Sequence, residues 1–206
     1  MKKIFFLFFL SLIPFTGLLW AQEGSPSGSR VVNKPDLRIG DSWVFHTPYN
    51  QSKATSTIQN IKDNLIYVTA PKNDCGMTNF AYTLEWAQVE VCGFTSPRRP
   101  GPITFDPPLQ FMPFPVWPGK QWSIKYTIWP GPVTYHAEGK AIGWETITVP
   151  AGTFEALKIE ATITAQGRPL PRSIWYAPGA NNFIKAVVVE PQRDFELETY
   201  KRGDST

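Results

Sequence analysis

The chain has 206 residues, of which 42% are apolar and 14% aromatic, with 20 Pro, 15 Gly and a formal net charge of +3. This apolar content supplies a packed core and argues against a disordered chain. The small net charge argues against a protein that reads nucleic acid through a clustered basic face. The many Pro and Gly residues indicate short extended segments broken by turns, which is typical of a β protein.

Residues 1–21 have the layout of a secretory signal peptide. Two lysines precede an apolar run that begins at Ile4, and Ala21 stands before a polar segment. We expect cleavage between Ala21 and Gln22 and export to the periplasm or the medium, with no stable membrane span left in the product. A retained membrane anchor is the alternative, which Pro14 disfavours by interrupting the run.

The rest of the chain divides by composition into three parts. Residues 22–34 are small and polar without a period, which predicts a flexible tether. Residues 35–200 are interpreted as a single β domain. The tail at 201–206, KRGDST, is expected to be disordered.

The β domain contains a short internal echo. Gly40-Asp41-Ser42-Trp43 and Gly119-Lys120-Gln121-Trp122 each open a run of extended segments. Two similar β units, 35–96 and 119–200, joined by a Pro-rich connector at 97–118, are therefore one arrangement that the sequence allows.

Strands are predicted where apolar and polar residues alternate. Trp43 and Phe45 share a face of the first strand, and runs at 55–61 and 65–70 form a hairpin through the turn residues at 62–64. Further strands are expected at 122–128, 134–149, 154–164, 173–177, 183–190 and 195–200. The prediction is an all-β, mainly antiparallel fold of about ten strands, built as curved sheets or a partly open barrel.

Two cysteines remain after removal of the signal peptide. Cys75 lies in the turn sequence NDCG, and Cys92 closes an extended run. Because an exported chain meets an oxidising compartment, we predict a Cys75–Cys92 disulfide. On the chain-entropy model it would stabilise the fold by roughly 3 kcal/mol. Redox or zinc chemistry is disfavoured, since there is no CxxC spacing.

The Pro-rich segment at 97–118 carries four large aromatic residues, Phe105, Phe111, Phe114 and Trp117. Proline cannot donate to a sheet ladder, so we interpret the segment as an extended connector. Two alternatives stay open for its aromatic side chains. They form a lid on the core, or they line an exposed apolar groove that contacts a ligand or partner.

The sequence offers no recognised catalytic motif. GxSxG, HExxH and a phosphate-binding Gly-rich loop are absent. His46 and His136 lie at polar positions of predicted strands, and Asp41 is expected to accept backbone donors in its turn. We therefore expect no catalytic, metal or cofactor-binding residue and no enzyme activity.

Several segments together resemble a known family. They are Gly40–Trp43, Phe114–Lys120 with Trp122, Val149-Pro150-Ala151-Gly152-Thr153-Phe154 and Trp175-Tyr176-Ala177-Pro178-Gly179. The combination resembles the TapB-like family, a bacterial exported domain family of unknown function, over residues 35–200. The resemblance implies a secreted or periplasmic antiparallel β protein without established catalytic residues. One departure is the insertion Ala180-Asn181-Asn182, where asparagine tolerates left-handed backbone angles.

Two functions follow as hypotheses. The first is an exported, non-catalytic structural or interaction domain of the bacterial envelope, with another envelope protein as its partner. The alternative is a periplasmic carrier or binding protein for an apolar or lipid-like ligand, since barrel mouths and concave sheets are frequent ligand sites. An apolar cavity near residues 105–122 would favour the carrier.

Overall fold

The computed structural model of the chain describes residues 28–69, 80–91, 102–190 and 193–204. These residues form β-strands and one short 3-10 helix, η1 (Pro178–Ala180). The strands are β1 (Ser42–Thr47), β2 (Ser52–Lys62), β3 (Leu65–Thr69), β4 (Phe80–Thr83), β5 (Gln88–Val91), β6 (Ile103–Leu109), β7 (Gln121–Trp129), β8 (Val133–Val149), β9 (Gly152–Ala165), β10 (Arg168–Ala177), β11 (Asn182–Val188) and β12 (Phe195–Lys201).

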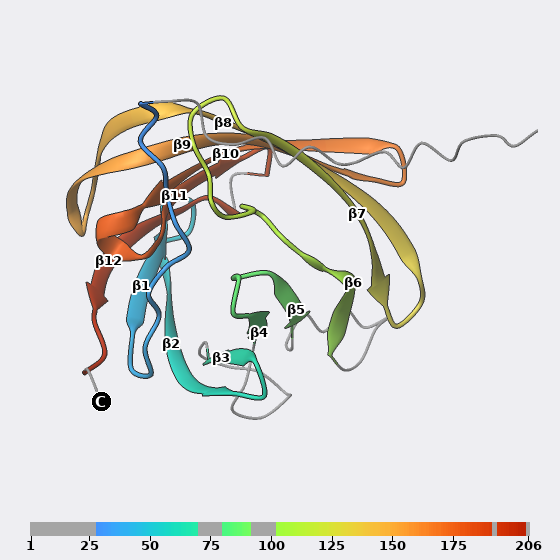
Figure 1. Ribbon diagram of the computed structural model, residues 1–206, viewed down its shortest axis with the longest axis horizontal. Coiled ribbons are helices and arrows are strands. Elements are labelled where there is room, and N and C mark those ends of the chain that lie inside the picture. The colour runs from blue at the N-terminus through green and yellow to red at the C-terminus, as the bar shows by residue number, and fades with distance from the viewer. Residues whose placement is uncertain (1–27, 70–79, 92–101, 191–192, 205–206) are drawn as a thin grey trace, which may run out of the picture.

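The strands join one closed barrel in which each strand pairs antiparallel with its neighbour in the chain. The barrel closes between β1 and β12, where Ser42 pairs with Lys201 (Figure 1). The predicted all-β, antiparallel fold is confirmed, with twelve strands among the described residues. Because the sheet is continuous, strands from both expected units, 35–96 and 119–200, belong to the same barrel.

Short-range turn signals act as the sequence predicts. Lys62 pairs with Leu65 across a two-residue turn in which Asp63 and Asn64 have φ of 53° and 60°. Both angles are left-handed, as a type I′ hairpin turn requires. Asn181, after η1, has φ of 52° and so accepts the left-handed conformation expected at the insertion.

A strand lies inside the segment expected to be a connector. The first residues of β6 pair with both β5 and β7, and Leu109 pairs again with β5. Pro107 and Pro108 have no partner in either ladder, because the β6–β7 pairing ends before them and the β5–β6 register shifts beside them. The prediction that proline keeps all of 97–118 out of the sheet is therefore wrong for 103–109, since a strand tolerates proline where no N–H is required.

The longest strands, β8 and β9, form a hairpin whose tip bends towards β12 (Figure 1). At the tip the Ala151 N–H donates to the Leu197 carbonyl at 3.0 Å. Further along β8, Gly139 lies under the ring of Trp122, and a Cβ there would clash with the ring. Glycine at this position lets an indole from the neighbouring strand β7 lie flat on the sheet.

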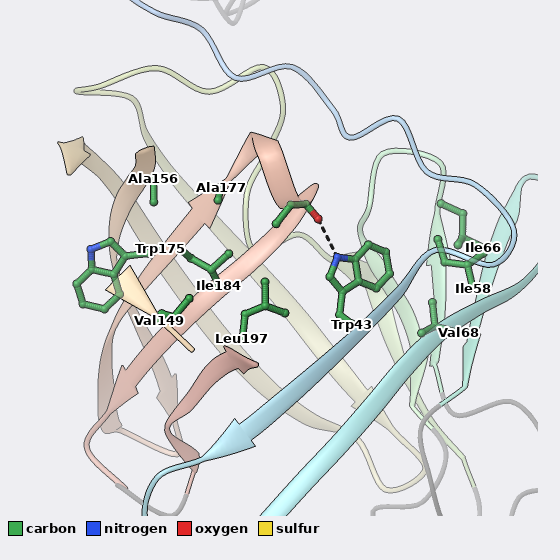
Figure 2. Packing of buried hydrophobic residues seen from close by; sticks show 11 residues of the cluster. Trp43, Ile58, Ile66, Val68, Val149, Ala156, Trp175, Ala177, Ile184 and Leu197 are labelled. Carbon is green, nitrogen blue, oxygen red and sulfur yellow. Dashed lines mark hydrogen bonds between the residues drawn. The ribbon is translucent and has the colours of Figure 1, made fainter. Parts of the chain in front are cut away.

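Trp43 lies at the centre of the largest group of buried side chains. Figure 2 shows its indole between Ile58 and Val68 on one side and Leu197 on the other. Its Nε1–H donates to the Ala180 carbonyl at 2.8 Å, so the buried ring leaves no polar atom without a partner. This contact joins β1 to the turn between β10 and β11.

The N-terminal segment before β1 packs on the chain that follows β6. Val32 and Val116 exchange two backbone hydrogen bonds, with N–O distances of 2.7 and 2.9 Å, and both side chains are buried. Val32 belongs to residues 22–34, which the sequence analysis interprets as a flexible tether. In the structure, residue 32 is part of the packed body.

Asp41 holds the C-terminal residues against the start of the barrel. Its fully buried carboxylate accepts the Arg38 N–H at 2.9 Å, which confirms the predicted turn role. It also accepts the Gly203 N–H at 2.7 Å and lies 3.3 Å from Arg202 Nε. Residues 201–204 are therefore held in place where the sequence analysis expects disorder, because a buried carboxylate needs these donors.

Candidate ligand-binding site

An apolar cavity of about 280 Å³ lies within the barrel. Its wall is mainly aromatic and comes from strands on both sides of the β1–β12 closure, together with the segment after β6. The aromatic lining includes Trp43, Phe45, Phe80, Tyr82, Trp86 and Phe183. Burial raises the pKa of the Tyr82 hydroxyl above its ordinary range, so this wall is uncharged at neutral pH.

A second cavity of about 190 Å³ adjoins the first. Phe111, Phe183 and Phe195 line both cavities, so the two spaces lie on either side of one group of three rings. The second cavity reaches from buried Ala186 to exposed Val189. It therefore runs from the interior of the barrel to its surface.

Strand β10 borders the second cavity through Leu170, Pro171, Arg172 and Ile174. Beyond Pro171 the side chains alternate, with Arg172 and Ile174 at the cavity and Ser173 and Trp175 on the opposite face. On that opposite face the Ser173 hydroxyl donates to Glu160 at 3.0 Å. The two faces of β10 thus have different chemistry at adjacent positions.

A row of charged residues surrounds Trp175 on this opposite face. The ammonium groups of Lys158 and Lys185 lie 5.5 and 5.9 Å from the Trp175 ring centroid. Trp175 Nε1–H donates to Glu145 at 2.8 Å, and Lys185 pairs with Glu196 at 2.8 Å. We call Glu145, Lys158, Trp175, Lys185 and Glu196 the charged row.

Arg172 is the charged residue of β10 that lines the second cavity. Its Nε is buried and has no hydrogen-bond acceptor, and no ion pair joins the guanidinium to another described residue. Burial lowers the pKa of Arg172, although guanidinium stays protonated at neutral pH. Burial raises the pKa of nearby Tyr126 to about 12, with Tyr135 adding to the rise and Arg172 opposing it.

The entrance of the second cavity carries a salt bridge. Glu190 and Arg193 both line the cavity, and Arg193 Nε lies 2.9 Å from Glu190 Oε2. Glu190 also attracts Arg172 electrostatically, so one carboxylate serves two arginines and these three charged residues of the cavity lining carry a net charge of +1.

The four aromatic residues predicted as candidate contacts do not gather at one place. Phe111 is the one that lines both cavities. Phe105 packs on Tyr126 with ring centroids 5.9 Å apart, and Phe114 packs edge-to-face on Tyr176. Trp117 is buried, under the Lys120 ammonium at 4.8 Å. The sequence allowed two alternatives for these residues, a lid on the core or an exposed groove. In the structure, Phe111 lines the cavities and the other three pack against neighbouring side chains.

Lys120 holds the turn that carries Phe114 and Trp117. Its ammonium donates to the carbonyl oxygens of Pro113 at 2.7 Å and Pro115 at 2.5 Å. These bonds satisfy carbonyls that proline-rich chain cannot place in a ladder.

The two histidines lie in exposed hydrogen bonds. His46 Nε2 lies 3.1 Å from Gln51 Oε1, and His136 Nε2 lies 2.7 Å from Ser123 Oγ. Glu138 approaches the same nitrogen of His136, at 3.9 Å. In a catalytic triad the hydroxyl and the carboxylate contact different ring nitrogens of the histidine. Ser123 and Glu138 both approach Nε2 of His136, so these three residues are not arranged as a triad.

Other predicted positions lie outside the described residues. They are the signal cleavage site at Ala21 and Gln22 and the disulfide between Cys75 and Cys92.

Sequence reasoning missed the main cavity-lining residues. The sequence pattern places Phe183 and Phe195 on strands without indicating a cavity, and it predicts no role for Arg172. Arg172 carries a local signal, a charged residue in phase with Leu170 and Ile174 on one strand. Phe183 and Phe195 carry none, since only the closed barrel brings them to Phe111.

The fold and cavities define a closed antiparallel β-barrel with an apolar interior site. No protein-family model matches the chain, and no curated protein does. Among solved structures, an inferred lipoprotein from Parabacteroides distasonis ATCC 8503 is similar at 12% identity and a TM-score of 0.42, covering 81% of this chain and 97% of its own. An inferred exported protein with a YmcC-like fold from Bacteroides fragilis NCTC 9343 is similar at 11% identity and a TM-score of 0.38, covering 84% and 100%. These likenesses are too distant to carry an argument.

The described residues were also considered for membrane-spanning helices and for metal ligands in groups. None of their helices is long and apolar enough to span a membrane. Nor do residues 28–69, 80–91, 102–190 and 193–204 contain a group of three or more His, Cys, Asp or Glu side chains suited to a metal ion.

Proposed function

We propose that this protein is an exported, non-catalytic binding protein that holds a small apolar molecule inside its barrel. The observation that carries the proposal is the pair of adjoining apolar cavities, about 280 and 190 Å³, that share Phe111, Phe183 and Phe195. Export is supported by the signal-peptide pattern of residues 1–21. Membership of the TapB-like family remains part of the proposal.

The wall of the site supports an apolar occupant. Removing apolar surface from water contributes about 25 cal/mol per Å² to binding, and aromatic side chains offer large contact areas. Ligand sites are commonly concave, mostly apolar and equipped with few polar groups. An engineered apolar cavity of about 150 Å³ in another protein stays dry and binds benzene, so cavities of this size are sufficient for a hydrocarbon segment.

The alternative, a structural or interaction domain, does not require an empty space inside the barrel. Such a domain works through its surface and is most stable with a barrel filled by its own side chains, because unfilled volume lowers stability. The two cavities therefore support the binding protein over the interaction domain.

The proposal is tested with N-phenyl-1-naphthylamine, a neutral probe that fluoresces in apolar surroundings. We expect saturable binding to the purified protein, and native mass spectrometry should find a co-purified apolar molecule before delipidation. Absence of both signals, with reproducible crosslinking to one envelope protein, would overturn the proposal in favour of the interaction domain.

A matched pair of variants on β11 locates the site. Ala186 is buried and lines the second cavity, while the neighbouring Val187 is exposed on the other face. Ala186→Leu fills cavity volume and should weaken probe binding about tenfold. Val187→Leu adds apolar volume outside and should leave binding unchanged. Equal affinities for both variants would place the probe elsewhere.

A further inference from the structure

We infer that the occupant of the cavities is an amphipathic monoanion, an acyl chain ending in a carboxylate, with Arg172 as its anchor. This inference rests on the proposed function and adds the ligand class and orientation. The carboxylate lies at Arg172 in the second cavity. The acyl chain passes Phe111, Phe183 and Phe195 into the first.

The first argument is the unmet hydrogen-bonding capacity of Arg172. Its Nε is buried without an acceptor, and no carboxylate among the described residues forms an ion pair with the guanidinium, which Glu190 attracts from beyond ion-pair distance. A partly buried charge without a direct ion pair loses hydration, and a ligand of opposite charge compensates that loss. The planar guanidinium fork matches a carboxylate through two parallel hydrogen bonds.

The second argument is the charge count around the cavity. Glu190 pairs with Arg193 at 2.9 Å at its entrance and also attracts Arg172, so the two arginines and one glutamate leave a net charge of +1. Tyr126, whose phenol is neutral at physiological pH, adds no compensating charge. This net charge matches one negative charge and leaves a dianion half unpaired.

The third argument is the arrangement along the wall. Arg172 is followed on the same face of β10 by Ile174, which lines the same cavity, and then the wall is aromatic up to Trp43 and Trp86. A charged end beside a long apolar surface is the pattern of an amphipathic ligand. The anion lies near the exposed entrance at Val189, where entry costs least desolvation.

The test compares three probes of equal chain length by calorimetry: dodecanoate, dodecanol and dodecyl phosphate. We expect dodecanoate to bind about tenfold to a hundredfold more tightly than dodecanol, since a hydrogen-bonded charge pair contributes that much. Arg172→Met should remove this difference, and its circular dichroism spectrum should match that of the unmodified protein. Arg172→Lys, which keeps the charge and loses the fork, should retain part of it.

The outcomes separate the two proposals. If neither dodecanol nor dodecanoate binds the unmodified protein, the proposed function itself fails. If Arg172→Met and the unmodified protein bind dodecanoate equally, the anchoring role of Arg172 is overturned and the proposed function stands. Dodecanol binding by the variant then shows that it is folded. Tighter binding of dodecyl phosphate than of dodecanoate would replace the carboxylate with a phosphate.

Brominated probes test the orientation, because bromine quenches nearby tryptophan fluorescence. Trp43 and Trp86 line the first cavity, at the far end from Arg172. A bromine at carbon 12 of dodecanoate should therefore quench more strongly than one at carbon 2. The reverse order would overturn the stated orientation.

Discussion

Arg172 and Trp175 lie three residues apart on β10 and face opposite sides of the sheet. On the Trp175 side, each charge has a partner: Lys185 meets Glu196 at 2.8 Å, and Lys158 lies 3.8 Å from Glu145. On the Arg172 side, the guanidinium borders apolar cavities and has no ion-pair partner among the described residues.

This difference separates structural charge from functional charge. Paired charges that flank an aromatic ring stabilise a sheet modestly and need nothing from outside the protein. A cation that borders a cavity without a partner lowers stability, and binding sites commonly contain such groups. The candidate binding site is therefore the interior of the barrel and not the charged row, although the charged row contains more ion pairs.

The largest expected effect concerns the interior tyrosines at alkaline pH. Burial raises the pKa of Tyr126 to about 12, above the value near 10 of an unfolded chain, and it also raises those of Tyr82 and Tyr176. This contribution is fully present below pH 10 and is lost as pH rises towards 12, because the unfolded state releases these protons first. Absorbance at 295 nm and circular dichroism should change together over this interval. Ionisation of all tyrosines near pH 10 with the fold intact would contradict the burial.

Next in size is Trp175→Ala on the opposite face. The variant removes a buried indole and leaves Glu145 without its 2.8 Å donor, so the free energy of unfolding should fall by about 3 kcal/mol in urea denaturation. Trp175→Phe keeps an aromatic ring between Lys158 and Lys185 and should cost about 1 kcal/mol. Equal losses for the two variants would mean that the ring itself contributes little.

The smallest effects should have opposite signs on the two faces. Arg172→Met replaces an unpaired interior cation with an apolar side chain and should raise the free energy of unfolding by about 1 kcal/mol. Lys185→Met removes a partly exposed ion pair and should lower it by about 0.5 kcal/mol. Thermal denaturation of the delipidated proteins measures both. Destabilisation by Arg172→Met would show that a partner in the protein already satisfies the guanidinium.

Local patterns predicted much of the fold because their causes are local. Alternation places Trp43 in the core, and Asp63 and Asn64 accept the left-handed angles of a hairpin turn. Composition misled at β6, where Pro107 and Pro108 suggested a connector. Their effect depends on whether the neighbouring strands require N–H donors at those positions, which one segment does not reveal.

The candidate site was less predictable than the fold. Of the four aromatic residues expected to contact a ligand, Phe111 lines the cavities, while Trp117 lies buried beneath Lys120. Both are large aromatic residues in the same Pro-rich segment of the sequence. Their different positions follow from what the barrel places beside each one.

The sequence by itself determined most of the strands, the hairpin turn at 63–64 and the Asp41 turn, because hydrophobic period, backbone preference and short hydrogen bonds act within a few residues. Only the tertiary structure decided the closure of β1 on β12 and the cavities inside it. Phe111, Phe183 and Phe195 come from distant parts of the chain, and Glu190, the carboxylate that attracts Arg172, forms its ion pair with Arg193 instead. Such neighbours are set by packing between elements, which the order of residues along one strand does not specify.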